Sequence, residues 1–98
     1  MARRLIVQPQ SELDIAAAAV WYEDQQSGLG ARFLDELSLV FQRIEQSPLE
    51  FPLLDSAVRR ALLRRFPFGV YFLTDHSEVK VLAVLNLHRH PDMWKSRN

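Results

Sequence analysis

Polar side chains that could perform chemistry are concentrated in the last stretch of the chain, LNLHRHPDMWKSRN at residues 85–98. Within five positions this stretch carries Asn86, His88, Arg89 and His90. An imidazole can take the proton of a ribose 2′-hydroxyl, and an arginine can stabilise the charge that develops on the phosphate. The residue types therefore permit RNA cleavage. The alternative interpretation is a polar strand end from which Trp94 folds back onto the domain.

Two arginine pairs form a second candidate site, because Arg59–Arg60 and Arg64–Arg65 fall within the predicted strand VRRALLRRF (58–66). Successive side chains of a strand point to opposite faces, so Arg59 and Arg65 would share one face and the other two arginines the opposite one. A planar guanidinium suits phosphate or carboxylate recognition. A nucleic acid or an acidic protein segment is one candidate ligand, and a solvated edge strand whose charges prevent aggregation is the alternative.

The charges are distributed unevenly along the chain, although the formal net charge is zero. Residues 1–55 hold four Lys and Arg against nine Asp and Glu, whereas residues 56–98 hold eight against three. The two halves therefore carry −5 and +5. This asymmetry indicates that one half meets an anionic partner, or that the halves neutralise each other across the fold.

Several classes of site and location are not expected. The chain has no cysteine, which excludes disulfides and thiolate metal ligands, and its three histidines lack metal-site spacing. No cofactor is expected, since GLG (28–30) has the character of a turn rather than a phosphate loop. The carboxylate pairs Glu23–Asp24 and Asp35–Glu36 are predicted to be solvated charges. No apolar stretch reaches about 18 residues and no signal peptide is recognised, so a cytoplasmic location without membrane contact is expected.

Two helices are predicted in the first half of the chain. The pattern S-E-L-D at Ser11 resembles a capping box and starts the first helix. The glycines of SGLG (27–30) end it, because a helix end favours a residue with positive φ. The second helix runs from near Gly30 to Ser47–Pro48, where proline stops it. A glycine-containing turn joins the two helices into an antiparallel hairpin.

Four strands are predicted around this hairpin, at RRLIVQ (3–8), VRRALLRRF (58–66), FGVYFLT (68–74) and EVKVLAVLNLH (78–88). In the last strand, one face is expected to carry Val79, Val81, Ala83, Leu85 and Leu87. The other face is expected to carry Asn86 and His88, with Arg89 on the side opposite to them. The expected fold is α+β, in the order β-α-α-β-β-β, with the helical hairpin packed on a small, mainly antiparallel sheet. Residues 1–98 form one domain, because neither half could bury its apolar face alone.

Four segments together resemble the RelE/ParE superfamily of bacterial toxins from type II toxin–antitoxin modules. They are GLGARFLDEL (28–37), RIEQSPLEFPLL (43–54), VRRALLRRFPFGVYF (58–72) and VKVLAVLNLHRHPDMW (79–94). The resemblance covers nearly the whole chain and implies the same β-α-α-β-β-β fold. It also implies a toxin that a partly disordered cognate antitoxin neutralises in a hetero-oligomer. RelE-like members cut mRNA on the ribosome, whereas ParE-like members inhibit DNA gyrase and perform no known chemistry of their own.

The end of the chain departs from the pattern H-x-x-R-D-P-x-x-W that many relatives share. Asn86 stands where the histidine would be and His90 where the aspartate would be, while Arg89, Pro91 and Trp94 match. RelE-like ribonucleases resemble one another in basic strand residues and a C-terminal tyrosine or similar group. No tyrosine follows Tyr71 in this chain. The resemblance therefore favours a ParE-like gyrase inhibitor over the alternative, a RelE-like mRNA endoribonuclease.

The candidate site residues follow from these patterns and from the resemblance. The residues expected to contact the target or the antitoxin are Arg59, Arg60, Arg64, Arg65, Tyr71, Asn86, Arg89 and Trp94. If the protein is instead a ribonuclease, the expected catalytic set is Arg65, His88 and Arg89. The expected target is DNA gyrase for the first function and ribosome-bound mRNA for the second.

Overall fold

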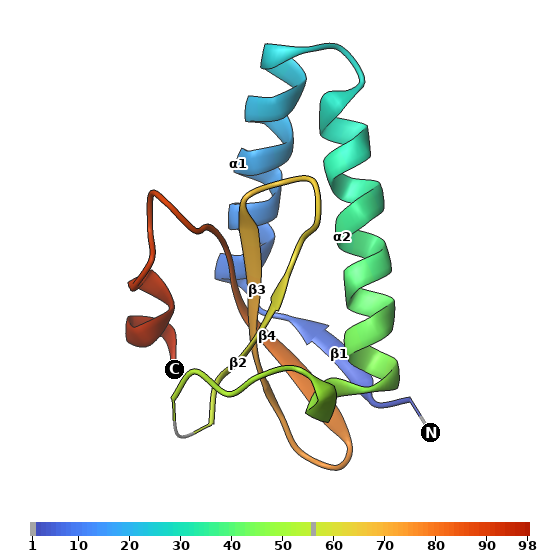
Figure 1. Ribbon diagram of the computed structural model, residues 1–98, viewed down its shortest axis with the longest axis vertical. Coiled ribbons are helices and arrows are strands. Elements are labelled where there is room, and N and C mark those ends of the chain that lie inside the picture. The colour runs from blue at the N-terminus through green and yellow to red at the C-terminus, as the bar shows by residue number, and fades with distance from the viewer. Residues whose placement is uncertain (1, 56) are drawn as a thin grey trace.

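The computed structural model describes residues 2–55 and 57–98, in which two helices cover one face of a four-stranded sheet (Figure 1). The elements are β1 (Arg4–Val7), α1 (Pro9–Gln25), α2 (Leu29–Gln46), the short 3-10 helix η1 (Pro48–Glu50), β2 (Arg59–Leu62), β3 (Phe68–Thr74), β4 (Glu78–Asn86) and the 3-10 helix η2 (Met93–Arg97). The strand order is β1-β4-β3-β2, with β1 parallel to β4 and the other pairs antiparallel. The predicted α+β fold and its β-α-α-β-β-β order are confirmed. Neither long helix of the described chain is apolar enough to span a membrane.

The turn between α1 and α2 depends on two glycines and one carboxylate. Gly28 has a φ of +89°, which confirms the prediction of a left-handed residue at this helix end. The Glu23 carboxylate accepts hydrogen bonds from the backbone N–H groups of Gly28 and Gly30, at 2.8 and 3.0 Å. A Cβ on Gly30 would lie 2.6 Å from the Ala19 carbonyl oxygen, so glycine lets α2 start directly against α1. The prediction that Glu23 is merely solvated is wrong, because it binds N–H groups that the start of α2 leaves unpaired.

The prediction of a capping box at Ser11 is also wrong. Helix α1 begins at Pro9, and its N-cap residue Gln8 makes no side-chain hydrogen bond to the helix. Ser11 therefore lies inside the first turn, where it is fully buried. Its hydroxyl donates a 2.9 Å hydrogen bond to the carbonyl of Val81 in β4. A residue that the local pattern assigns to a helix cap thus joins the helix to the sheet.

A bulge in β4 reverses the predicted alternation of its side chains. In the antiparallel pairing with β3, Tyr71 lies opposite Ala83, but Phe72 lies opposite Val81. Leu82 is consequently an extra residue, and from Ala83 onward the strand presents its other face to the helices. The predicted face of Val79, Val81, Ala83, Leu85 and Leu87 is therefore divided. The first two belong to the core under the helices, whereas Ala83 and Leu85 belong to a second core on the far side.

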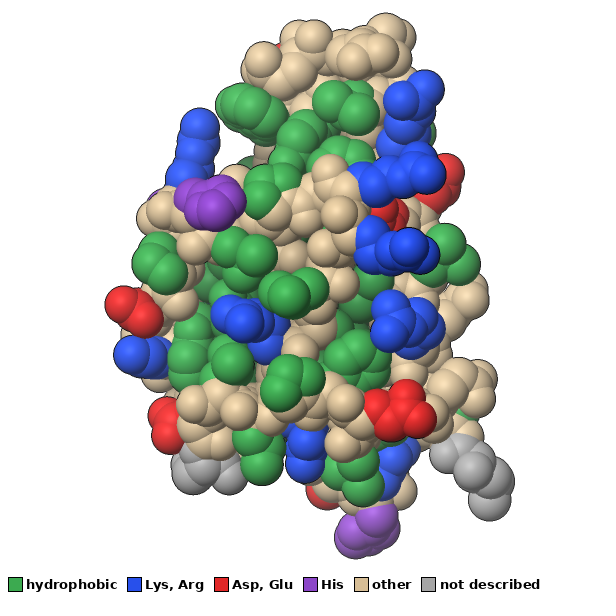
Figure 2. Space-filling model, in the orientation of Figure 1, with side chains coloured by type: hydrophobic (Ala, Val, Ile, Leu, Met, Phe, Trp, Pro, Cys, Tyr) green, Lys and Arg blue, Asp and Glu red, His purple; other side chains and the backbone are tan. Residues whose placement is uncertain are grey.

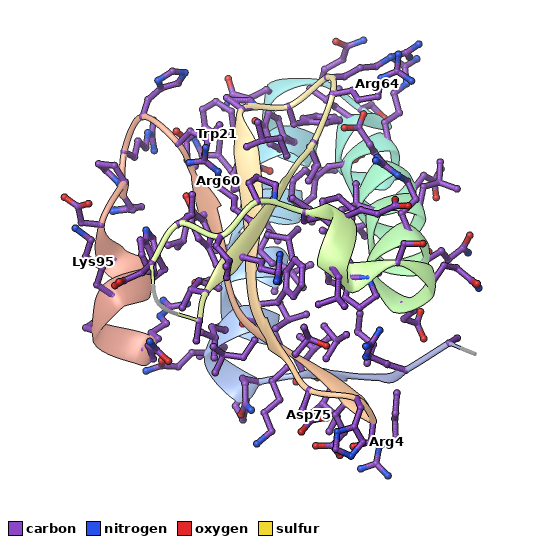
Figure 3. All side chains as sticks on the ribbon, turned by 60° about the horizontal axis from the view of Figure 1, so that its bottom comes forward. Arg4, Trp21, Arg60, Arg64, Asp75 and Lys95 are labelled. Carbon is purple, nitrogen blue, oxygen red and sulfur yellow. The ribbon has the colours of Figure 1, made fainter. Side chains whose placement is uncertain are left out.

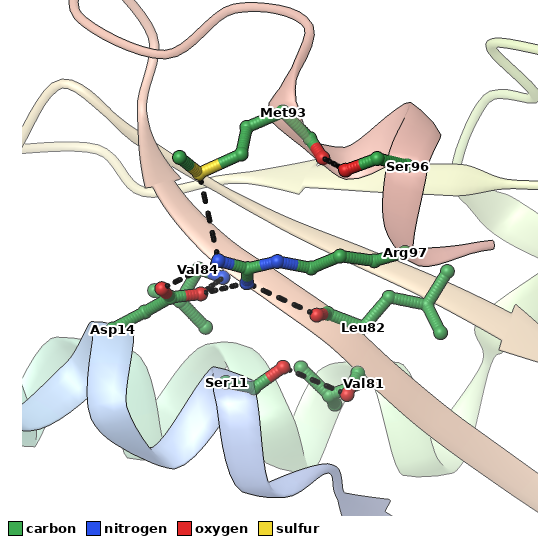
Figure 4. A network of polar contacts seen from close by, with 8 residues as sticks. All are labelled: Ser11, Asp14, Val81, Leu82, Val84, Met93, Ser96 and Arg97. Carbon is green, nitrogen blue, oxygen red and sulfur yellow. Dashed lines mark hydrogen bonds and ion pairs between the residues drawn. The ribbon is translucent and has the colours of Figure 1, made fainter.

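A buried ion pair binds backbone groups of β4 at the bulge and just beyond the end of its pairing with β1 (Figure 4). The Asp14 carboxylate accepts a 3.0 Å hydrogen bond from the N–H of Val84. It also binds the Arg97 guanidinium through two contacts, at 2.5 and 3.1 Å. Arg97 in turn donates to the Leu82 carbonyl at 3.3 Å. Because each side chain of the pair is 13% exposed, this contact is largely shielded from water.

Both faces of the sheet are buried. Under the helices, the core includes an aromatic cluster of Tyr22, Phe33, Phe66 and Phe68, in which ring centroids lie 4.7 to 6.0 Å apart. On the opposite face, the second core consists of Val58, Tyr71, Leu82, Ala83, Leu85 and Trp94. Trp94 belongs to η2, so the C-terminal segment covers the sheet face that the helices leave open.

The second strand is shorter than the sequence predicts. β2 ends at Leu62, so Arg64 and Arg65 lie in the turn to β3 rather than in the strand. The Glu36 carboxylate of α2 accepts hydrogen bonds from both of their backbone N–H groups, at 2.5 and 3.1 Å. The prediction that Glu36 is merely solvated is therefore wrong. The alternation of faces predicted for the four arginines does not apply beyond Leu62.

We expect the Asp14–Arg97 pair to contribute strongly to stability. Replacing Asp14 with Ala should cost about 3 kcal/mol, because it leaves Arg97 as a partly buried charge without its partner and also removes the acceptor of the Val84 N–H. Arg97→Ala should cost less, and the double variant should be more stable than the two separate losses predict, by about 1 kcal/mol or more. Urea denaturation of the four proteins measures this coupling. Additive losses would contradict it.

The β3–β4 turn should make stability depend on pH in acid. The backbone N–H groups of Ser77 and Glu78 and the Ser77 hydroxyl donate to Asp75, and these bonds lower the pKa of its carboxyl from 3.8 to about 2. A lowered pKa in the folded state stabilises the fold above pH 3.8, and this contribution is lost as the pH falls towards about 2.

The matched variant is Asp75→Asn, which keeps an acceptor oxygen but does not titrate. The stability advantage of the wild type over this variant should be constant above pH 3.8 and should shrink below it. Thermal unfolding of both proteins across this range measures the difference. An advantage that stays constant down to pH 2 would show that the turn hydrogen bonds do not favour the charged carboxylate.

Candidate functional site

The chain reverses direction immediately after β4, where the sequence predicts that the strand continues. β4 ends at Asn86, whose side-chain Oδ1 accepts hydrogen bonds from the N–H groups of His88 and Arg89, at 2.9 and 3.2 Å. The Asn86 carbonyl accepts a further bond from the His90 N–H. This side-chain-to-backbone turn is one that asparagine favours. The prediction that strand alternation separates Asn86 from Arg89 is wrong, because no strand exists beyond Asn86.

The turn places Asn86 and Arg89 in the lining of the same groove, which lies between α1 and the ends of β3 and β4 and has a volume of about 460 Å³. Its lining is mostly apolar and consists of Asp14, Ala17, Ala18, Trp21, Tyr22, Pro67, Phe68, Val84, Leu85, Asn86, Arg89 and His90. The bulge in β4 contributes to this arrangement, since it sends Val84 to the side of the sheet that the helices cover. Apolar walls with a few polar groups at the rim are typical of a binding site.

Arg89 supplies the positive charge of the groove. Its guanidinium carbon lies 5.6 Å from the centroid of the Trp21 ring, within the range of a cation–π contact. Among the described residues, Arg89 forms no ion pair with an acidic side chain. Burial raises the pKa of the neighbouring Tyr22 phenol, and the charge of Arg89 partly opposes that rise. At neutral pH the groove therefore presents a neutral phenol and an arginine whose charge is not neutralised.

The four predicted binding arginines do not form one strip. Arg59 donates to the carbonyls of Phe51 and Leu49, at 2.6 and 3.4 Å, and so fastens the segment before β2. The side chain of Arg60 packs over Gly69, and its buried Nε has no hydrogen-bond partner within the described chain.

The remaining cations are spread over the surface. Figure 3 shows Arg64 at the opposite end of the sheet from Arg4 and Asp75, with Lys95 on the C-terminal segment. On the face drawn in Figure 2, several Lys and Arg side chains lie along one edge, and others lie at the centre and on the opposite edge among hydrophobic side chains. The basic residues are thus separated by apolar surface rather than forming a continuous cationic patch.

Tyr71 and Trp94 are inside the protein. Their rings stack 5.6 Å apart at an angle of 11°, and their exposed fractions are 1% and 5%. The indole N–H of Trp94 donates to the carbonyl of Pro91 at 3.0 Å. These contacts hold η2 on the sheet. They agree with the alternative interpretation of the C-terminal stretch, in which Trp94 folds back onto the domain. The predicted contact of Tyr71 and Trp94 with a partner would require η2 to move.

The three residues predicted to be catalytic in a ribonuclease do not come together at the groove. Arg89 lines it, but Arg65 and His88 do not. His90, which the sequence pattern places outside that set, does line it. The described residues also contain no group of three His, Asp or Glu side chains that could hold a metal ion.

Trp21 is one of the groove residues that sequence reasoning missed. It lies beside the helix face formed by the apolar residues Ile15, Ala18, Ala19 and Tyr22 of α1, and it is 45% exposed. A large aromatic residue next to the core-facing stripe of a helix is the signal that could have identified it. A tryptophan left partly exposed in this way is a frequent anchor of protein interfaces.

No protein-family model matches this sequence, and no curated protein matches it either. A chain of a solved structure described as the chromosomal ParDE TA system from P. aeruginosa superposes on it with a TM-score of 0.77 and 17% sequence identity. The alignment covers 87% of this chain and 96% of that one. At this identity the similarity shows a shared fold.

The Asn86 turn makes a prediction about local protection of the backbone. In Asn86→Ala, the N–H groups of His88 and Arg89 lose their acceptor and should exchange with solvent faster, at a stability cost of about 1 kcal/mol. Asn86→Asp keeps the acceptor oxygen and is the matched control. Amide hydrogen exchange followed by NMR measures both sites. Equal exchange rates in the alanine variant and the wild type would show that the side chain does not hold this turn.

Proposed function

We propose that this protein is the toxin of a type II toxin–antitoxin module, bound and neutralised by a cognate antitoxin, and that it is a ParE-like inhibitor of DNA gyrase. The observation that carries this proposal is the fold similarity to a chain of a ParDE TA system over 87% of the present chain. The resemblance of four sequence segments to the RelE/ParE superfamily supports the same assignment independently of the superposition.

The placement of the candidate catalytic residues supports the ParE-like function over a RelE-like endoribonuclease. A base and a phosphate-stabilising cation must both come within hydrogen-bonding reach of one reacting group. Arg89 lines the groove without Arg65 or His88, and the Arg65 backbone is bound to Glu36 at the β2–β3 turn. A nuclease would have to use His90 beside Arg89 instead. Asn86, which stands in place of the family histidine, carries an amide that cannot act as a base, and its oxygen binds backbone N–H groups.

Charge also supports a protein partner. The half of the chain that includes β2, β3, β4 and η2 carries a net charge of +5. Complementary charge raises the rate at which two proteins meet and selects among partners. An antitoxin segment with acidic residues fits this half, as does an acidic surface of the target.

Supercoiling by purified gyrase tests the proposed function directly. The folded chain should inhibit supercoiling, and Arg89→Ala should weaken this inhibition by about 10-fold, the loss expected for one central arginine. Arg32→Ala, on exposed helix surface away from the groove, is the matched control. Unimpaired supercoiling at a large excess of folded protein would contradict gyrase inhibition.

Two parallel measurements separate the remaining functions. Cleavage of messages in a translating extract, abolished by Arg89→Ala, would establish the endoribonuclease alternative instead. Normal growth of cells that express the chain without an antitoxin would show that it is not an active toxin.

A further inference from the structure

Helix α2 carries a charged face that is centred on one exposed leucine. Leu39 lies in the middle of the helix and is 60% exposed. Asp35 stands four residues before it and Arg43 four residues after it, and both are exposed. Positions four apart lie on the same side of a helix, so these three side chains form one row. The buried residues of α2 lie on the other side of the helix, at Phe33, Leu37, Val40 and Ile44.

The charges of this row are not neutralised within the described chain. Neither Asp35 nor Arg43 takes part in an ion pair there. The guanidinium carbon of Arg43 lies 5.4 Å from the centroid of the Phe51 ring, a contact that leaves its charge in place. The row therefore exposes one anion and one cation, at equal distances on either side of an apolar side chain.

We propose that this face of α2 binds the same face of a second copy of the chain, with the two helices antiparallel and a two-fold axis passing through Leu39. In a two-fold interface each patch meets an identical patch, so it must be complementary to itself. Here Asp35 of each copy meets Arg43 of the other, and the two Leu39 side chains meet at the axis. The dimer thus gives both charges the partners that they lack in one chain.

The flanking residues of the face fit the same arrangement. Glu36 and Gln42 lie three residues on either side of Leu39, and Arg32 and Gln46 lie seven residues on either side. In the antiparallel pair, each of these two charged side chains therefore meets an amide, which can donate to a carboxylate and accept from a guanidinium. Glu36 can keep its bonds to the β2–β3 turn, because a carboxylate has about four acceptor sites.

The mixture of signs argues for a second copy over other occupants. A nucleic acid would bring phosphates against Asp35 and Glu36, and an acidic protein segment would bring carboxylates against them. Parallel packing of two α2 helices would place each Asp35 beside the other Asp35. The antiparallel pair alone satisfies both signs. Since Arg32 and Gln46 are about 21 Å apart along the helix, the contact is smaller than a standard interface and the dimer is reversible.

Sedimentation equilibrium of the purified chain measures this association. We expect at least half of the chain to be dimeric at about 100 μM. Asp35→Arg and Arg43→Asp each place like charges at both symmetric contacts, so each should weaken the dimer by about 10-fold or more. Glu12→Arg is the matched control, because it makes the same charge change on the exposed surface of α1. It should leave the dimer unchanged.

Mixing the two charge-swapped variants tests the register of the contact. In a mixed pair, each of the two contacts again joins an arginine to an aspartate. An equal mixture of Asp35→Arg and Arg43→Asp should therefore dimerise about as well as the wild type, although each variant alone is mainly monomeric. Loss of folding in either variant could not produce this recovery, and circular dichroism verifies that both are folded.

Three outcomes would overturn the inference. They are a chain that is mainly monomeric at about 100 μM, charge swaps that weaken the dimer no more than Glu12→Arg does, and a mixture of the two variants that stays monomeric. The dimer does not depend on the proposed function, because sedimentation requires neither an antitoxin nor gyrase. Failure of one therefore leaves the other intact.

Discussion

The contact between Asp14 and Arg97 determines how the two ends of this chain meet the sheet. The pair joins residues 83 positions apart, and through Val84 and Leu82 it also binds the bulge of β4. A bulge leaves backbone groups without strand partners, and such groups are costly when they are buried. Here a side chain from α1 and another from η2 bind backbone groups at the bulge and just beyond the end of the pairing with β1. The helix, the irregular strand and the C-terminal segment are therefore stabilised together.

The groove is a consequence of this arrangement. The bulge turns Val84 and Asn86 towards α1, and the Asn86 side chain then closes the turn that brings Arg89 over Trp21. Stacking of Trp94 on Tyr71 holds η2 against the other side of the sheet. The segment between Asn86 and η2 must consequently pass around the sheet end next to α1. One wall of the groove thus depends on contacts made on the opposite face of the sheet.

The sequence predicts the fold well because its signals are local. Glycines at 28 and 30 and the proline at 48 bound the helices, and runs of β-branched or aromatic residues indicate β1, β3 and β4. The bulge has no such signal, since nearly every position from Val79 to Leu85 is apolar and either register looks alike. The actual register depends on Ser11, Asp14 and Arg97, which are distant in sequence. The roles of Glu23 and Glu36 could not be predicted from the sequence for the same reason. Each carboxylate binds backbone N–H groups of a loop, and the position of that loop is known only from the folded structure.

Helix α1 carries more apolar side chains than its packing uses. Ser11, Ala18 and Tyr22 face the sheet and the second helix, and that side is sufficient to hold α1 in place. Leu13 and Val20 contribute nothing to either core, and apolar side chains that expose more than half of their surface favour association. A helix needed for packing alone would carry polar residues there. The side of α1 that carries them therefore presents apolar surface to solvent beside the Trp21–Arg89 contact, and the packing of the chain does not account for it.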